Sequence, residues 1–116
     1  MLSAPELVTL RASLVKRLEA LRATSETTAE NRRPVELDQT SVGRLSRMDA
    51  IQVQAMALAT EGRRHDEARR VEAAISRIDE GEYGYCISCD EEISAKRLGV
   101  DPVIPTCIGC ASGAGR

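Results

Sequence analysis

The chain has 116 residues, 42% of them hydrophobic, and a net charge of −2 from 16 basic and 18 acidic side chains. This length fits one domain of ordinary size. There is no run of about 18 apolar residues and no basic-then-apolar leader, so we expect a soluble, cytoplasmic protein without a membrane partner. Binding to the phosphates of nucleic acid needs concentrated Lys and Arg, whereas this chain has a net charge of −2. We therefore expect no bulk electrostatic attraction to nucleic acid.

The amino-terminal region carries the signals of a helix start. Ser3 can cap a helix, Pro5 stands in its first turn, and Glu6 follows the cap by three residues. Leucines then recur at steps of three and four and share one helix face; they are Leu7, Leu10, Leu14, Leu18 and Leu21. We expect this helix to end by about residue 32. The run after Thr24 is polar, and Pro34 disfavours helical geometry at the residue before it.

A second helix follows a reversal near residues 33–40. Asp38, Thr40 or Ser41 could cap it, and Gly81 suits the left-handed turn after its end. Its apolar repeat consists of Val42, Leu45, Met48, Ile51, Ala55, Leu58, Ala68, Val71, Ile75 and Ile78. The spacing predicts a helix of about 60 Å, at 1.5 Å per residue.

We expect a mainly α fold in which these two helices form a long antiparallel coiled coil. Folding the first helix back along the first half of the second lets the two apolar stripes bury each other. Residues 1–80 would then be an antiparallel coiled-coil arm with its tip near 33–40, and residues 81–116 a small C4 zinc-finger module with a short tail.

The zinc prediction rests on four cysteines in two Cys-x-x-Cys pairs that are 17 residues apart: Cys86, Cys89, Cys107 and Cys110. In a cytosolic chain this arrangement favours metal ligation over disulfides. Four thiolates fill a tetrahedral Zn²⁺ shell and leave no position for an activated water, so the ion would be structural. Redox-active dithiols would need a strand-helix-strand context that the sequence lacks.

The segment around these cysteines resembles the zinc finger of the DksA/TraR family. The matching residues are Gly81-Glu82-Tyr83-Gly84-Tyr85-Cys86-Ile87-Ser88-Cys89, then Ile93, Arg97-Leu98, Pro102 and Cys107-Ile108-Gly109-Cys110. A long antiparallel coiled coil before the finger is also that family's layout. The resemblance implies a transcription regulator, not an enzyme, that binds RNA polymerase directly and no specific DNA sequence. Its arm would enter the secondary channel, with the tip near the catalytic centre.

The same resemblance indicates which residues act at the tip. The family's Asp-x-x-Asp-x-Ala motif aligns its second Asp with Asp38 and its Ala with Thr40, while Val35 stands at its first Asp. Glu36 supplies an acid next to the missing one. A shorter register would instead place the tip near Asp49-Ala50.

The resemblance also locates basic positions. Those that bind the alarmone guanosine tetraphosphate in some members fall on Arg63, Arg70, Asp101 and Ala111. Two of the four carry no positive charge, so alarmone synergy should be weak or absent. Arg63, Arg70 and Arg97 are candidate polymerase contacts, although Arg97 could instead brace the finger.

Two other functions remain open from the sequence. Glu36 and Asp38 could hold a second Mg²⁺ at the polymerase centre, as in a transcript-cleavage factor. The zinc module could bind nucleic acid by itself, although the finger is acidic and has few aromatic residues. Near the tip, Arg32 and Arg33 could steer the arm towards its target or be solvated flanking charges.

Overall fold

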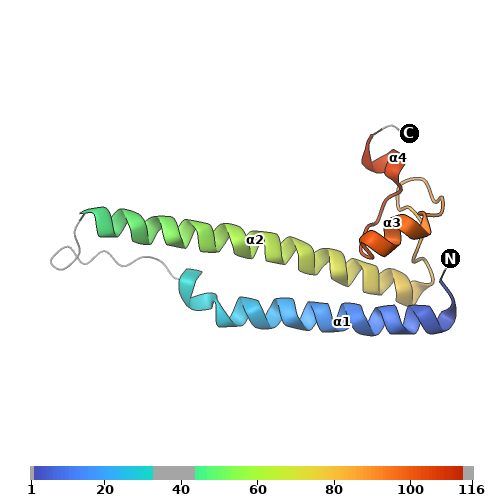
Figure 1. The fold of residues 1–116 in the computed structure, drawn as a ribbon, viewed down its shortest axis with the longest axis horizontal. Helices are drawn as coiled ribbons and strands as arrows, with labels where there is room; N and C mark the ends of the chain where they lie inside the picture. Colours follow the sequence, from blue (N-terminus) through green and yellow to red (C-terminus); the bar gives the residue numbers. More distant parts are fainter. Residues whose placement is uncertain (1, 33–43, 114–116) are drawn as a thin grey trace. The chain divides into compact units, whose positions relative to one another are not determined.

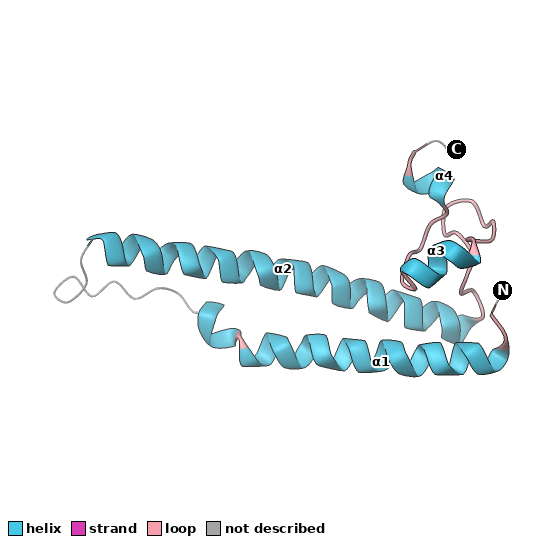
Figure 2. Cartoon of the chain, in the orientation of Figure 1, coloured by secondary structure: helices cyan, strands magenta, loops and turns pink. Residues whose placement is uncertain are grey.

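The structure of the protein is a computed structural model that describes residues 2–32 and 44–113 (Figure 1). The elements are α1 (Ala4–Thr27), a 3-10 helix η1 (Ala29–Arg32), α2 (Arg44–Glu80), α3 (Ala95–Val100) and α4 (Ile108–Ala111). Within the described ranges there is no strand, only an isolated antiparallel bridge between Tyr85 and Glu92 (Figure 2). None of the described helices is long and apolar enough to cross a membrane.

The predicted start of the first helix and the predicted end of the second are confirmed, whereas the candidate caps of the second helix, Asp38, Thr40 and Ser41, lie outside the described residues. At the start of α1 the Glu6 amide donates to Ser3 Oγ (3.4 Å), and Glu6 Oε1 accepts from the Ser3 amide (3.1 Å). This reciprocal pair satisfies two amides that have no partner inside the helix. At the end of α2, Gly81 has a φ of 76°, and the Glu82 amide donates to the Arg77 carbonyl at 2.8 Å. A left-handed glycine of this kind stops the helix.

Contacts divide the chain into two compact units, Met1–Leu18 with Arg69–Arg116, and Glu19–Ala68. Each helix of the arm therefore contributes to both units. In the first unit the beginning of α1 runs antiparallel to the end of α2 (Figure 1). Its helix seam buries Leu14, Leu18, Val71 and Ala74. At the edge of the seam Arg11 forms a two-fold ion pair with Asp79, at 2.7 and 3.0 Å.

The second unit shows that one packing expectation was wrong. Ser25, near the end of α1, bonds to Glu61 in the middle of α2, so α1 does not cover the first half of α2. Met48, Ile51 and Leu58, expected in the seam, are 57%, 48% and 50% exposed. The physical reason is the register: α1 ends at Thr27, before it could reach these turns.

Candidate zinc centre and the residues around it

Two tight turns bring the four cysteines together after α2. In the first turn the Asp90 amide donates to the Cys86 carbonyl (2.9 Å), and Asp90 itself has a left-handed φ of 64°. In the second turn Cys107 caps α4, because its Sγ accepts from the Cys110 amide at 3.5 Å. The Ile87 amide donates to the Pro105 carbonyl (2.9 Å) and ties the two turns to each other.

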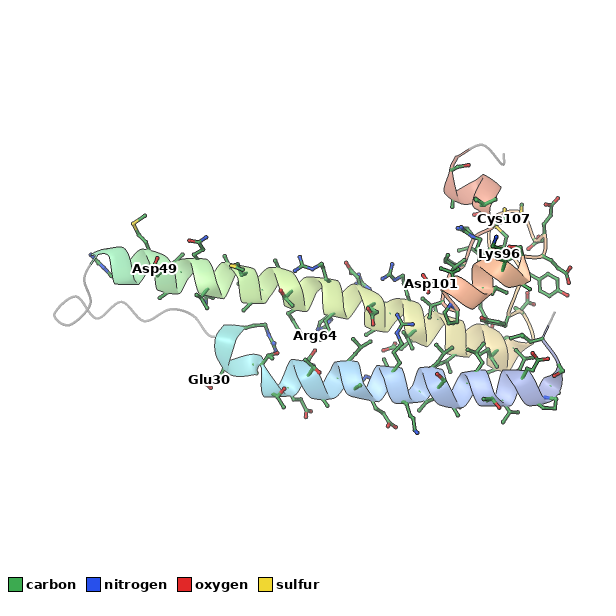
Figure 3. The ribbon with its side chains drawn as sticks, in the orientation of Figure 1. Glu30, Asp49, Arg64, Lys96, Asp101 and Cys107 are labelled. Atoms are coloured by element: carbon green, nitrogen blue, oxygen red, sulfur yellow. The ribbon has the colours of Figure 1, made fainter. Side chains whose placement is uncertain are left out.

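The geometry of the sulfur atoms fits one tetrahedral ion. All four Sγ atoms lie within 4.8 Å of one another, and the sulfurs of Cys89 and Cys107 are 3.7 Å apart. A Zn–S bond of about 2.3 Å in a tetrahedron requires sulfurs about 3.8 Å apart. Cys86 is 1% exposed and the other three are half-buried (Figure 3 labels Cys107).

The thiols have very different acidities without an ion. Burial raises the pKa of Cys86, but backbone N–H groups, including those of Cys107 and Ser88, outweigh it and lower that pKa to about 6. A hydrogen bond to Cys107 and burial raise the pKa of Cys110. Four thiolates this close repel one another, so only a bound cation lets all four ionise at neutral pH.

Several predicted site residues lie elsewhere in the described structure. Arg97 is half-buried, and its Nε donates to the Thr106 carbonyl at 3.0 Å, so it braces the loop before Cys107. Asp101 caps the end of α3, and its side chain accepts from the Val103 amide at 3.3 Å (Figure 3). Arg63 and Arg70 are exposed on α2, and Ala111 is exposed at the end of α4.

The predicted tip residues Glu36, Asp38 and Thr40 lie outside the described residues. Asp49 and Ala50, the alternative tip, are exposed on α2 inside its second turn (Figure 3).

The second unit contains a charged cluster around Glu61 that was not predicted from the sequence. Glu61 is 9% exposed and accepts from Ser25 (3.0 Å) and Arg64 (2.6 Å), and Arg32 lies 3.4 Å from the same carboxylate oxygen. Arg32 also donates to the Ser25 carbonyl (2.8 Å) and to Thr28 Oγ1 (2.9 Å). The guanidinium of Arg32 is therefore neither a steering charge nor a solvated flank. The available signal in the sequence was a Glu followed closely by Arg63 and Arg64 within an apolar repeat.

The fold and the four-sulfur site define a C4 zinc-finger protein with a helical arm. Residues 81–114 match the family described as "Prokaryotic dksA/traR C4-type zinc finger". Transcription factor DksA2 from Pseudomonas aeruginosa shares the fold: the TM-score is 0.74, with 97% of this chain and 85% of that chain covered at 19% identity. Residues 81–114 are thus a C4 zinc finger of the DksA/TraR type, and its four cysteines bind one structural zinc ion.

The chain is also similar to curated proteins over about half of its length. The RNA polymerase-binding transcription factor DksA of Haemophilus influenzae is 32% identical over 56 residues, 48% of this chain and 39% of that protein. The protein of the same name from Escherichia coli K12 is 29% identical over 56 residues, 48% of this chain and 37% of its own length. The matched segments thus span less than two fifths of these relatives.

Proposed function

We propose that the protein is a transcription regulator, not an enzyme, that binds RNA polymerase directly and recognises no specific DNA sequence. The observation that carries this proposal is the DksA/TraR finger at residues 81–114. The relatives that match 56 residues of this chain are named RNA polymerase-binding transcription factors. We place the protein in the cytoplasm, where it meets the polymerase.

In this proposal residues 1–80 form the arm, residues 81–116 the finger, and the tip near 33–40 enters the secondary channel. Asp38, with Glu36 and Thr40, acts near the catalytic centre, and the zinc ion keeps the finger folded. The Glu61 cluster supports this arrangement, because it holds Arg32, the residue directly before the segment that carries the tip. A fixed base limits the directions in which that segment can leave the arm.

In this proposal guanosine tetraphosphate adds little to the effect of the protein on the polymerase, because two of its four expected basic positions carry no positive charge. Arg63 and Arg70 are exposed on α2 and contact the polymerase surface in the proposed complex. Asp101 would repel the anionic alarmone, and Ala111 supplies no charge to it. Arg97 acts inside the finger through Thr106 in this proposal, and contributes to polymerase binding only by keeping the finger in shape.

Competition and transcription assays test the proposal together. The purified protein should displace another secondary-channel factor from RNA polymerase, and its failure to do so would refute the proposed function. Transcription from a ribosomal promoter is then measured with wild type, Asp38→Asn and Asp38→Ala, each with and without guanosine tetraphosphate. The Asp38 variants should lose the effect while they keep polymerase affinity. Asp49→Asn is the matched control, and loss of effect there instead would support the shorter register.

A further inference from the structure

The first unit contains a groove that lies apart from the four zinc ligands. It has a volume of about 800 Å³ and lies between the first turns of α1 and the α3 side of the finger. Leu10 contributes to one wall, and Ile93 and Leu98 to the other. Ligand sites in proteins have volumes of about 300–1,000 Å³ and mostly apolar walls. The groove therefore has the size and the lining of a binding site.

The finger wall of the groove is held in place by hydrogen bonds. Tyr83, which is 4% exposed, donates its hydroxyl hydrogen to the Pro102 carbonyl at 2.8 Å. Ile93, which is 5% exposed, donates its amide to the Gly84 carbonyl at 2.8 Å. All four residues line the groove. A preformed wall lowers the entropy cost of binding.

The charges at the groove have a single sign. Among the described residues that line it, Glu6 and Glu92 are charged and none is Lys or Arg. Hydrogen bonds from the Ser3 amide and hydroxyl, at 3.1 and 2.8 Å, fix the Glu6 carboxylate. Glu92 is exposed, and its backbone is paired with Tyr85. An apolar groove lined by carboxylates is complementary to an apolar segment that carries a cation.

We propose that this groove binds an amphipathic helical segment of RNA polymerase that presents Leu- or Ile-type side chains beside a Lys or Arg. The inference rests on the proposed function for its partner and adds the chemistry of the contact. Helices commonly bind in this way, with apolar side chains in the groove and charges at its edge. The finger then anchors the protein to the polymerase by a surface separate from the tip.

Two pairs of variants test the groove, and each has a matched control. A Cβ added at Gly99 or at Gly62 meets nothing within 4 Å, so both positions accept a larger side chain. Gly99 lines the groove, whereas Gly62 lies on α2 and does not. Glu92 lines the groove, and its exposed neighbour Glu91 does not. The pairs Gly99→Leu with Gly62→Leu and Glu92→Lys with Glu91→Lys therefore separate the groove from general effects of size and charge.

The readout is the affinity of each zinc-loaded variant for purified RNA polymerase. We expect Gly99→Leu to weaken binding at least tenfold and Gly62→Leu less than twofold. Glu92→Lys should weaken binding at least fivefold more than Glu91→Lys, and this difference should shrink at high salt. Zinc content and circular dichroism report whether each variant folds. If Gly99→Leu loses its zinc, the Glu92 and Glu91 pair decides the question.

The outcomes distinguish this inference from the proposed function. Wild-type affinity of folded Gly99→Leu, or equal effects of Glu92→Lys and Glu91→Lys, would overturn the groove contact and leave the regulator itself intact. Failure of the wild type to bind polymerase would overturn both. Self-association of the wild type that Gly99→Leu abolishes, with polymerase affinity unchanged, would assign the groove to a second copy and likewise overturn the proposal.

Discussion

Ser25 donates a hydrogen bond of 3.0 Å to Glu61, and this contact sets the register of α1 against α2 in the second unit. The carboxylate of Glu61 is also shared by Arg64 and Arg32, at 2.6 and 3.4 Å (Figure 3 labels Arg64). Both guanidinium groups are largely buried, with 16% and 19% of their side chains exposed. The carboxylate of Glu61 therefore offsets part of the positive charge of both Arg32 and Arg64, whose side chains have little access to water.

Glu61→Gln should lower the free energy of unfolding. The amide keeps the shape but leaves Arg32 and Arg64 without their anionic partner, and hydrogen bonds to charged groups contribute about 1.5–3 kcal/mol. Urea unfolding followed by the helical circular dichroism signal measures the change. Glu19→Gln, at an exposed position of α1, is the control and should change the free energy by less than about 0.5 kcal/mol. Equal effects of the two substitutions would mean that the cluster contributes no stability.

The same cluster predicts a pH dependence. Burial raises the pKa of Glu61, but hydrogen bonds from Arg64 and Ser25, and the charges of both arginines, outweigh it and lower the pKa below the 4.5 of an ordinary glutamate. A carboxylate with a lowered folded-state pKa stabilises the fold above 4.5, and this stability is lost as the pH falls through the folded-state value. The urea midpoint of wild type should therefore fall more steeply below pH 4.5 than that of Glu61→Gln. Zinc release at acid pH affects both proteins alike, so parallel curves would contradict the prediction.

The sequence predicted those features that depend on a few neighbouring residues. The Ser3 and Glu6 pair and the left-handed Gly81 each follow from local backbone chemistry. The cysteine spacing is local too, because each turn of four residues brings its own two thiolates to the ion. These parts could be assigned without knowledge of the rest of the chain.

The register between the helices could not be predicted in this way. Any pairing of two apolar repeats that differs by one heptad buries a similar set of side chains, and polar contacts between distant residues choose among them. The Ser25 and Glu61 pair joins positions 36 residues apart and leaves Met48 exposed. The groove has the same origin, since Leu10 and Leu98 line it together although they lie far apart in the sequence. Neither the register nor the groove can be predicted from the sequence of a single helix.

Ser3→Ala should destabilise the start of α1. The substitution removes the hydroxyl that accepts from the Glu6 amide and donates to the Glu6 carboxylate at 2.8 Å. Loss of such a cap costs about 0.5–2 kcal/mol. Amide hydrogen exchange should show faster exchange in the first turn of α1 than in the wild type. Ser13→Ala, inside the same helix, is the matched control and should leave the first turn unchanged, because Ala favours the helix interior.

Cys107→Ser should abolish zinc binding and unfold the finger while the helices of the arm persist. The substitution removes one of four ligands and also the sulfur that accepts from the Cys110 amide, and structural zinc supplies on the order of 10 kcal/mol of folding free energy in comparable peptides. Bound zinc is measured by native mass spectrometry, and helix content by circular dichroism. Thr106→Ser, one residue away, should keep a full zinc ion, since Arg97 bonds only to the backbone carbonyl of Thr106.

In polymerase assays Cys107→Ser should dock weakly but keep the tip effect at saturating protein, because in the proposed complex the zinc centre shapes the docking surface and not the tip. A zinc-free variant with normal polymerase affinity would show instead that docking needs no folded finger.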